Sequence, residues 1–237
     1  MTLRALVTDI EGTTTDLAFV HARLFPLARA EMPRFVRAHH LDPEHAASFA
    51  AVRRAAAGEG RDPSAVSLDE VLAQLLAWMD ADAKVTALKA LQGAIWREAY
   101  AGGALTSHVY EDVAPAFRRL DAAGVRIHVY SSGSIEAQRL LFRHSAAGDL
   151  TPCLAGYFDT TTGPKKEAAS YARIAAAIGV PAGEILFVSD AIAELDAARA
   201  AGMATLWMVR PGCSEVGPKG HAQASSFEGI GERPCGP

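Results

Sequence analysis

Short apolar runs that end abruptly in polar residues are the clearest pattern along the chain. Five runs have the length of a buried strand, and they cover residues 3–8, 125–130, 154–158, 185–188 and 204–209. A continuous apolar run of this length, followed by turn residues, is typical of a strand buried on both faces. The first, second and fourth runs lead directly into small or acidic polar residues. We therefore predict five strands, and we look for chemistry at their carboxyl ends.

Helical patterns alternate with these strands after about residue 110. They cover residues 114–123, 135–144, 167–178 and 192–201. Glycine follows three of them, as is common where a helix ends. This order predicts the α/β class, with a doubly wound, mostly parallel Rossmann-like sheet that has helices on both faces. Ligands of such a sheet bind beyond the carboxyl ends of its strands.

A long interval separates the first strand from the second. At about 110 residues it far exceeds a crossover helix, so it must hold a structure of its own. Apolar residues at helical spacing predict helices over 17–40, 43–57 and after Ser67, where Ser67 and Glu70 form a capping box. We predict an inserted all-helical cap at 17–104 and a discontinuous core domain at 1–16 and 105–237.

The last 27 residues, Pro211–Pro237, are rich in Gly and Pro. Their composition predicts no regular element, although we expect Ser225-Ser226-Phe227 to dock on the core.

Charge and composition exclude several classes of protein. Lys and Arg total 23 against 27 Asp and Glu, without a long run of one sign, so nucleic acid is not an expected partner. No apolar stretch reaches ~18 residues, and Asp9 comes too early for a signal peptide, so we expect no membrane partner and a cytoplasmic location. Cys153, Cys213 and Cys235 form no Cys-x-x-Cys pair and are expected to be reduced.

Asp9 and Glu11 stand two residues apart at the end of the first strand, where a period of two puts both carboxylates on one side. Ser131 and Ser132 end the second strand and precede a helix, a natural seat for phosphate. Each feature also has an ordinary interpretation. Acidic residues solvate loops at strand ends, and a serine before a helix is a common N-cap.

Asp190 and Lys165 complete the set of candidates. Asp190 ends the fourth strand and could bind a metal beside Asp9, or only cap the helix that carries Glu194. Lys165 has Lys166 beside it, so either lysine could face the site. Pro164 restricts the backbone just before them, which favours Lys165 as the lysine directed toward the site. The sequence has no Gly-x-Ser-x-Gly, no Gly-x-Gly-x-x-Gly and no P-loop, so serine hydrolases, dinucleotides and nucleoside triphosphates lose support.

These residues suit the attack of a carboxylate on a phosphate monoester. Like charges at 4 Å repel by roughly 4 kcal/mol at an effective dielectric of 20, so cations must lie alongside. Mg²⁺ and Lys165 would supply them, with the amides near Ser132 holding the phosphate oxygens. Asp9 would be the nucleophile, Asp190 a metal ligand, and Glu11 the acid and base.

The chain resembles the haloacid dehalogenase superfamily and, within it, the enolase-phosphatases of methionine salvage. Asp9-Ile10-Glu11-Gly12-Thr13-Thr14 has Glu where the superfamily usually has a second Asp. Further stretches that look alike are Leu91–Trp96, Tyr110–Val113, Tyr130–Gln138, Phe158–Thr160 and Val209–Gly212. The resemblance covers nearly the whole chain.

The resemblance implies enolisation of 2,3-diketo-5-methylthiopentyl 1-phosphate and then hydrolysis of its phosphate, with one Mg²⁺ per chain. We expect a monomer, although the sequence leaves the association of chains open. It implies catalytic roles for Asp9, Glu11 and Lys165, substrate contacts from Ser131, Ser132 and Lys165, and a metal site at Asp9, Glu11 and Asp190. Glu11 would bind through its backbone carbonyl, and Glu194 would support the site from behind. The alternatives are a phosphatase for another small phosphate ester, a dehalogenase that needs no Mg²⁺, and a non-catalytic phospho-ligand-binding protein.

Overall fold

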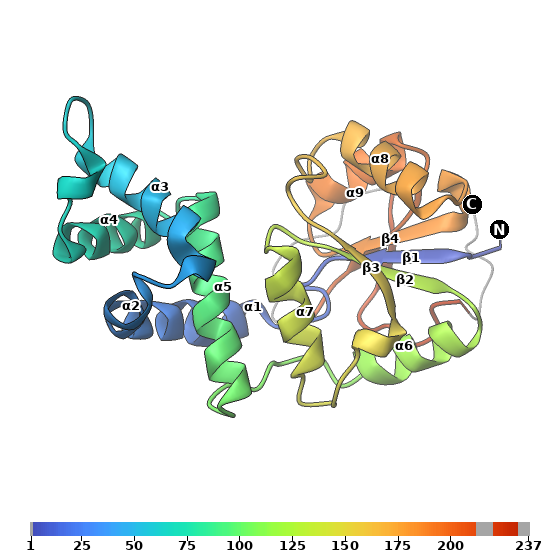
Figure 1. Ribbon diagram of the computed structural model, residues 1–237. Coiled ribbons are helices and arrows are strands. Elements are labelled where there is room, and N and C mark those ends of the chain that lie inside the picture. The colour runs from blue at the N-terminus through green and yellow to red at the C-terminus, as the bar shows by residue number, and fades with distance from the viewer. Residues whose placement is uncertain (1, 212–219, 232–237) are drawn as a thin grey trace. The chain divides into compact units, whose positions relative to one another are not determined.

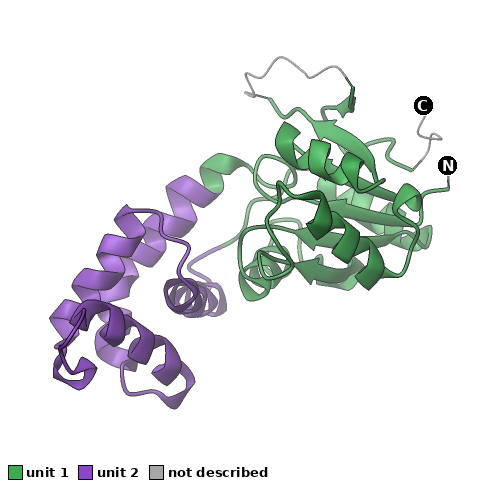
Figure 2. Ribbon diagram, turned by 90° about the horizontal axis from the view of Figure 1, so that it is seen from above, with its two compact units in different colours: residues 1–19, 106–237 green, residues 20–105 purple. Residues whose placement is uncertain are grey.

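The computed structural model describes residues 2–211 and 220–231. The chain forms two compact units, residues 1–19 with 106–237 (the core unit) and residues 20–105 (the helical unit) (Figure 2). The sequence-based boundaries at 16/17 and 104/105 differ slightly, because the chain leaves the core unit only after the short helix α1 (Leu17–Phe19).

The core unit contains a six-stranded parallel sheet in the order β3-β2-β1-β4-β5-β6. Its strands are β1 (Ala5–Thr8), β2 (Arg126–Tyr130), β3 (Leu154–Phe158), β4 (Ile185–Ser189), β5 (Ala204–Met208) and β6 (Ala222–Ala224). The five predicted strands are present.

The sixth strand corrects the prediction that the C-terminal region has no regular element. β6 has three residues and pairs with the edge of β5 through Leu206 and Ala222. A strand this short carries too little pattern to stand out in a Gly- and Pro-rich stretch. Phe227 is fully buried in the core, as expected. Of the cysteines, Cys153 is free, while Cys213 and Cys235 lie outside the described residues.

Helices cover both faces of the sheet (Figure 1). Residues of α6 (Val113–Ala122) and α7 (Ile135–Arg143) pack with Leu6 of β1 on one face. Residues of α8 (Ala168–Ile178) and α9 (Ile192–Ala200) pack with Ala5 and Val7 on the other. Successive side chains of a strand point to opposite faces, so a run that is apolar throughout can feed two cores. The predicted doubly wound fold is confirmed.

The centre of the sheet defines where a ligand can reach the chain. β1 lies between β2 and β4, with Thr8 paired to both Val129 and Val188. The strand order reverses at β1, and the polar residues after the three strands therefore emerge side by side at the carboxyl edge.

The helical unit follows α1 through a π-helical turn, Val20–Leu24. Its helices are α2 (Phe25–His39), α3 (Ala46–Ala57), α4 (Leu68–Asp80) and α5 (Thr86–Ala101). Short 3₁₀ turns cover Pro43–His45 and Pro63–Ala65 in this unit, and Thr151–Cys153 and Ala182–Glu184 in the core unit. The helix predicted over 17–40 is thus divided into α1, the π-helical turn and α2. The Ser67–Glu70 capping box is present at the start of α4, and apolar residues such as Phe35, Leu75 and Leu91 form the core of the unit.

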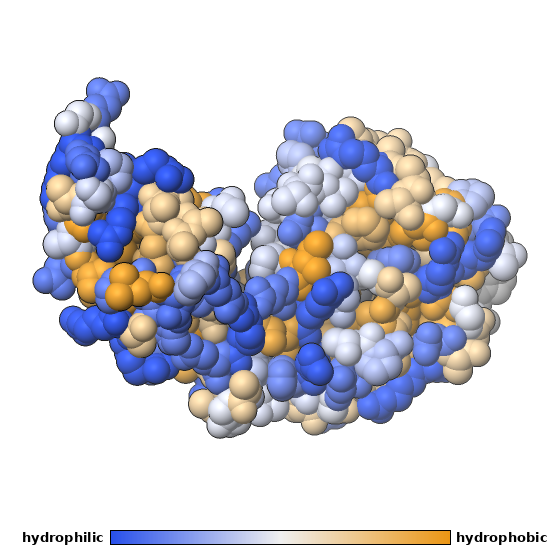
Figure 3. Space-filling model, in the orientation of Figure 1, coloured by the Kyte–Doolittle hydropathy of each residue, from blue (hydrophilic) through white to orange (hydrophobic). Residues whose placement is uncertain are grey.

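Most large apolar side chains of the described residues are buried. The exposed exceptions are Leu17 at 44% and Leu41 at 81%. Each unit shows polar and apolar side chains intermingled on the face seen in Figure 3. Within the described ranges, no helix combines the length and the apolar character needed to cross a membrane.

Candidate active site

Asp9 follows β1 directly and is 6% exposed. Its backbone N–H donates to the carbonyl of Val188 in the neighbouring strand, which fixes the main chain. Its Oδ1 accepts the N–H of Ile10 at 2.8 Å and lies 2.7 Å from Lys165 Nζ. The carboxylate is thus held at the edge of the sheet between a backbone amide and an ammonium.

Lys165 lies between two carboxylates. Its Nζ is 2.7 Å from Asp9 Oδ1 and 2.8 Å from Glu194 Oε2, and its side chain is 12% exposed. Burial opposes the charged ammonium, but the negative charges of Asp9 and Glu194 raise the pKa of Lys165 above its ordinary value. The adjacent Lys166 is exposed. Lys165 is therefore the lysine that faces Asp9.

Two buried tyrosines hold the loop that carries Lys165. Tyr171 Oη donates to the Lys165 carbonyl at 2.7 Å, and Tyr130 Oη donates to the Gly163 carbonyl at 2.8 Å. The two rings also meet edge to face, with centroids 5.6 Å apart. We did not predict either tyrosine from the sequence. Tyr171 comes six residues after Lys165, a spacing with no local signal.

Glu194 on α9 enters the site more directly than the sequence predicted. We expected it to support the site from behind, but its carboxylate contacts Lys165. Ser189 Oγ lies 3.2 Å from Glu194 Oε2 and 3.4 Å from Asp9 Oδ2, and its single proton can serve one of them at a time. Burial and then the charge of Asp9 raise the pKa of Glu194 to about 7.

Asp190 lies against the loop that follows Asp9. Its N–H donates to Thr13 Oγ1 at 3.0 Å, and Trp207 Nε1 donates to its carbonyl at 3.0 Å. Gly12 has φ +69°, and a Cβ there would lie 2.1 Å from Asp190 Oδ2. Burial, followed by the charges of Asp9 and Glu11, raises the pKa of Asp190 to about 6. The two acidic loops therefore converge.

Ser131 and Ser132 follow β2, beside β1 in the sheet. Ser131 N donates to the Phe158 carbonyl at 3.2 Å, and Ser131 Oγ accepts the N–H of Gly133 at 3.1 Å. The N-cap of α7 is Ser134, whose Oγ accepts the N–H of Ala137. The ordinary N-cap role thus belongs to Ser134 rather than to the two candidate serines.

Gln138 fixes this serine loop and was not among the predicted site residues. Its Nε2 donates to the carbonyls of Gly133 and Phe158, both at 2.9 Å. Gln138 follows the N-cap Ser134 by four residues, one helical turn, so its side chain points back toward the loop. That spacing was the available signal.

The charges at this edge suit a hard divalent cation. Among the described residues, Asp9, Glu11, Asp190 and Glu194 bring four carboxylates to this edge, and Lys165 brings one ammonium. Within the described ranges no three His, Cys, Asp or Glu side chains gather as a complete metal site. Mg²⁺ commonly takes only one or two carboxylates and fills its other positions with water and substrate oxygens. Oxygen donors from Asp9, Asp190 and the backbone of Glu11 fit that requirement.

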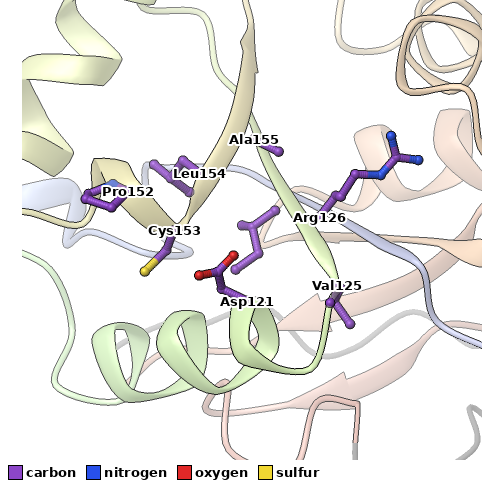
Figure 4. A pocket seen from close by; sticks show the side chains of 9 residues that line it. Asp121, Val125, Arg126, Pro152, Cys153, Leu154 and Ala155 are labelled. Atoms are coloured by element: carbon purple, nitrogen blue, oxygen red, sulfur yellow. The ribbon is translucent and has the colours of Figure 1, made fainter.

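A separate hollow of about 210 Å³ lies at the opposite edge of the sheet, where β2 and β3 begin (Figure 4). Asp121, Arg126 and Cys153 are among the residues that line it. Burial raises the pKa of the Cys153 thiol, so it stays protonated and a poor nucleophile. This hollow is remote from the acidic cluster.

Known proteins resemble this chain over nearly its whole length. Residues 3–202 match the model of the haloacid dehalogenase-like hydrolase family. An enolase-phosphatase E1 from Sorangium cellulosum is 55% identical over 96% of this chain and 97% of its own. One from Pseudomonas aeruginosa is 53% identical over 97% and 99%. The solved structure of the UTR4 protein of Saccharomyces cerevisiae covers 96% of this chain and 99% of its own, with TM-score 0.83 and 32% identity.

Proposed function

We propose that this chain, which belongs to the haloacid dehalogenase-like hydrolase family and within it to the enolase-phosphatases E1, acts in methionine salvage. It enolises 2,3-diketo-5-methylthiopentyl 1-phosphate and then hydrolyses the phosphate. The products are the acireductone 1,2-dihydroxy-3-keto-5-methylthiopentene and inorganic phosphate. The observation that carries the proposal is the buried Asp9 carboxylate, 2.7 Å from Lys165 Nζ at the carboxyl edge of β1.

Asp9 is the proposed nucleophile. Its carboxylate oxygen attacks phosphorus, the bond to the substrate oxygen breaks, and the leaving oxygen takes a proton from Glu11. Water then attacks the aspartyl-phosphate, giving its proton to Glu11, and the Asp9 carboxylate is restored. Lys165 offsets the repulsion between the carboxylate and the phosphate dianion, and the double hold on its ammonium keeps it placed for this.

We propose that Asp9, Asp190 and the backbone carbonyl of Glu11 hold one Mg²⁺ per chain. When bound, Mg²⁺ supplies positive charge for the phosphoryl oxygens and for the enolate oxygen. The excess of carboxylates over Lys165 supports this proposal, because a cation relieves the mutual repulsion that contributes to the raised pKa of Asp190.

Ser131 and Ser132 are the proposed contacts of the phosphate group, through their hydroxyls and a backbone amide near Ser132 in the loop before α7. The hydrogen bonds from Gln138 to the Gly133 carbonyl of this loop and to the Phe158 carbonyl at the end of β3 support a fixed cradle. In the first reaction a carboxylate of the same cluster removes the proton from the carbon beside the ketone.

We propose that residues 1–16 with 105–237 are the catalytic core, and that residues 17–104 act as a helical cap that selects the thioether end of the substrate. We further propose that the enzyme is a monomer and works in the cytoplasm. Light scattering after size-exclusion chromatography tests whether the enzyme is a monomer, and cell fractionation tests whether it is in the cytoplasm.

The decisive experiment incubates the protein with the diketo phosphate and Mg²⁺, and follows enol absorbance and phosphate release together. We expect the enol signal first, then phosphate, and loss of phosphate release in excess chelator. Absence of both signals contradicts the proposal. Preference for another phosphate ester indicates a different phosphatase of the family, and tight binding of phosphate esters without turnover indicates a non-catalytic receptor.

A further inference from the structure

Arg210 is a buried cation outside the proposed set of reacting residues. It follows β5 and is 6% exposed. Its Nη1 lies 2.8 Å from Asp112 Oδ1 and donates to the Ser225 carbonyl at 3.1 Å. Its guanidinium lies over the ring of Tyr110, 4.0 Å from the centroid. Its Nε donates to the carbonyl of Thr13 at 2.8 Å.

Thr13 connects this cation to the acidic cluster. Its carbonyl accepts Arg210 Nε, while its Oγ1 accepts the N–H of Asp190 at 3.0 Å. Thr13 is fully buried, so both hydrogen bonds are shielded from water. Two links therefore lead from the Arg210 guanidinium to the backbone of Asp190.

The space around Asp190 tolerates little movement of this loop. The preceding residue, Gly12, approaches the Asp190 carboxylate so closely that a Cβ would lie 2.1 Å from Oδ2. A shift of the Thr13 backbone by a fraction of an ångström would therefore alter the separation of Asp190 from the loop that carries Asp9 and Glu11.

The guanidinium is suited to such a role by its shape. Its planar fork fixes several hydrogen bonds in set directions, whereas a lysine ammonium is a flexible point charge. Asp112 completes the arrangement, because its Oδ2 accepts the N–H of Phe227 at 2.6 Å while Oδ1 holds Arg210. The loop at Thr13, the start of α6 and the segment at 225–227 are thus fixed to one another through Arg210 and Asp112.

We propose that Arg210 is a positioning residue for the divalent-cation site: it fixes the Thr13 backbone and, through Thr13, the placement of Asp190 against the Asp9 loop. This inference rests on the metal role proposed for Asp190. Arg210 then controls the affinity for Mg²⁺ more than the affinity for the phosphorylated substrate.

The test compares Arg210→Lys and Arg210→Met with Arg119→Met. Arg119 is a matched control, because its Nη1 donates to the Ile230 carbonyl at 2.9 Å and so anchors the same C-terminal segment. The first readout is thermal unfolding of substrate-free protein over a Mg²⁺ titration. The second is the Mg²⁺ dependence of phosphate release, with kcat and KM for the diketo phosphate measured separately.

Arg210→Lys should raise the Mg²⁺ concentration for half-maximal stabilisation about tenfold, the usual scale for residues that orient metal ligands. KM for the substrate at saturating Mg²⁺ should change by less than about threefold, since the proposal gives Arg210 no contact with the substrate. Arg119→Met should lower the unfolding temperature and leave the Mg²⁺ midpoint unchanged. An unchanged midpoint in Arg210→Lys, or an equal shift in Arg119→Met, overturns the proposal.

Thr13→Val covers the case in which the Arg210 variants do not fold. It removes the Oγ1 acceptor for Asp190 and keeps the carbonyl that Arg210 holds, with Thr13→Ser as the conservative control. We expect the Mg²⁺ concentration for half-maximal stabilisation to be higher in Thr13→Val than in the wild type, and to be close to the wild-type value in Thr13→Ser. The same value in Thr13→Val as in the wild type contradicts the inference. A wild-type protein that shows no Mg²⁺ response also contradicts it. If the wild type binds Mg²⁺ but leaves the diketo phosphate unchanged, only the proposed function fails.

Discussion

Ion pairs in the two units of the molecule lie in opposite environments. In the helical unit Arg29 pairs with Asp80, with side chains 46% and 64% exposed. In the core unit Lys165 and Asp9 are 12% and 8% exposed. Exposed pairs contribute about 0–1 kcal/mol to stability. A buried pair must overcome a large desolvation cost, and an apolar pair of similar volume is often at least as stable.

The difference indicates which charges the fold retains for chemistry. Among the described residues of the core unit, buried ion pairs join Lys165 to Asp9 and Glu194, and Arg210 to Asp112. Lys165 and Arg210 each contact the loop that follows β1, Lys165 through Asp9 and Arg210 through Thr13. The helical unit builds its core from apolar side chains and keeps its ion pairs near water. Charge is therefore concentrated where the parallel strands end, the place where this type of fold binds ligands.

The same chemical change at a buried and at an exposed aspartate gives the largest expected contrast. Asp9→Asn removes the proposed nucleophile, so phosphate release should fall on the order of 10⁴-fold or more. Asp80→Asn breaks the exposed pair with Arg29 and should leave the rate unchanged. Single-turnover phosphate release measures both. A rate in Asp9→Asn within tenfold of the wild type would remove Asp9 as the nucleophile.

A comparison of two glycines sharpens the importance of close packing at the acidic cluster. Gly12 and Gly124 have nearly the same backbone angle, φ +69° and φ +79°, but only Gly12 faces the Asp190 carboxylate, since a Cβ at Gly124 meets nothing within 4 Å. Each substitution to Ala should cost about 1 kcal/mol of backbone strain. Gly12→Ala should also displace Asp190 and lower phosphate release about 10²-fold.

Unfolding in urea and steady-state rates for the two variants check this expectation. Equal activity in Gly12→Ala and Gly124→Ala would show that the close approach of Gly12 to Asp190 has no functional weight.

The sequence predicted the sheet better than the contacts of the site. The weaker run near 154–158 was placed correctly as a strand, because a short, mostly apolar run before a polar turn is a local signal. β6 was missed since three residues carry almost no pattern. Asp9, Asp190 and Lys165 could be placed at one edge because parallel strands all end there. The order of the strands does not predict the contact between Glu194 and Lys165. This contact depends on how α9 is rotated and how closely it packs against the sheet.

Arg210 illustrates why the remaining residues escaped prediction. Its partners Thr13, Asp112 and Ser225 come from three distant parts of the chain. No spacing rule connects them, so the arrangement is visible only after the sheet has assembled.

His128 contrasts with the buried ion pairs, because it is a titratable side chain buried in β2 with no charged partner among the described residues. It is 7% exposed, and neither ring nitrogen has a hydrogen-bond partner in the described part of the chain. Burial, with a smaller effect from Arg126, lowers the pKa of His128 to about 4. An unfolded chain binds this proton near pH 6.5. The neutral His128 ring therefore makes its full contribution to the free energy of unfolding above about pH 6.5. This contribution is lost as the pH falls toward 4, and the loss reaches up to about 3 kcal/mol.

Urea unfolding of the wild type and His128→Leu across pH 4 to 7 isolates this contribution. Asp190 and Glu194, whose pKa values are raised, contribute a slope of opposite sign, but it is common to both proteins and cancels in their difference. The free-energy difference between the two proteins should change with pH in this window. A constant difference would show that His128 is not a buried neutral group.

The smallest effect is expected at the exposed pair of Arg61 and Glu70 in the helical unit. Glu70 Oε2 accepts from Arg61 Nη2 at 3.1 Å and from the backbone N–H of Ser67 at 2.9 Å, and the hydrogen bond from Arg61 is the largest cause of a Glu70 pKa lowered to about 2. Both side chains are 42% exposed, so water and salt screen the attraction. Arg61→Met should lower the unfolding temperature only slightly, because the capping box still holds the carboxylate. Thermal unfolding of Arg61→Met and of the wild type at low and high salt measures this loss. Arg61→Met should release phosphate at the wild-type rate. Removing one partner of a buried pair, as Arg210→Met does with Asp112, should destabilise the fold strongly, by about 3–5 kcal/mol. A loss of that size in Arg61→Met would mean that exposure does not separate the two classes of ion pair, and the contrast between the units would lose its basis.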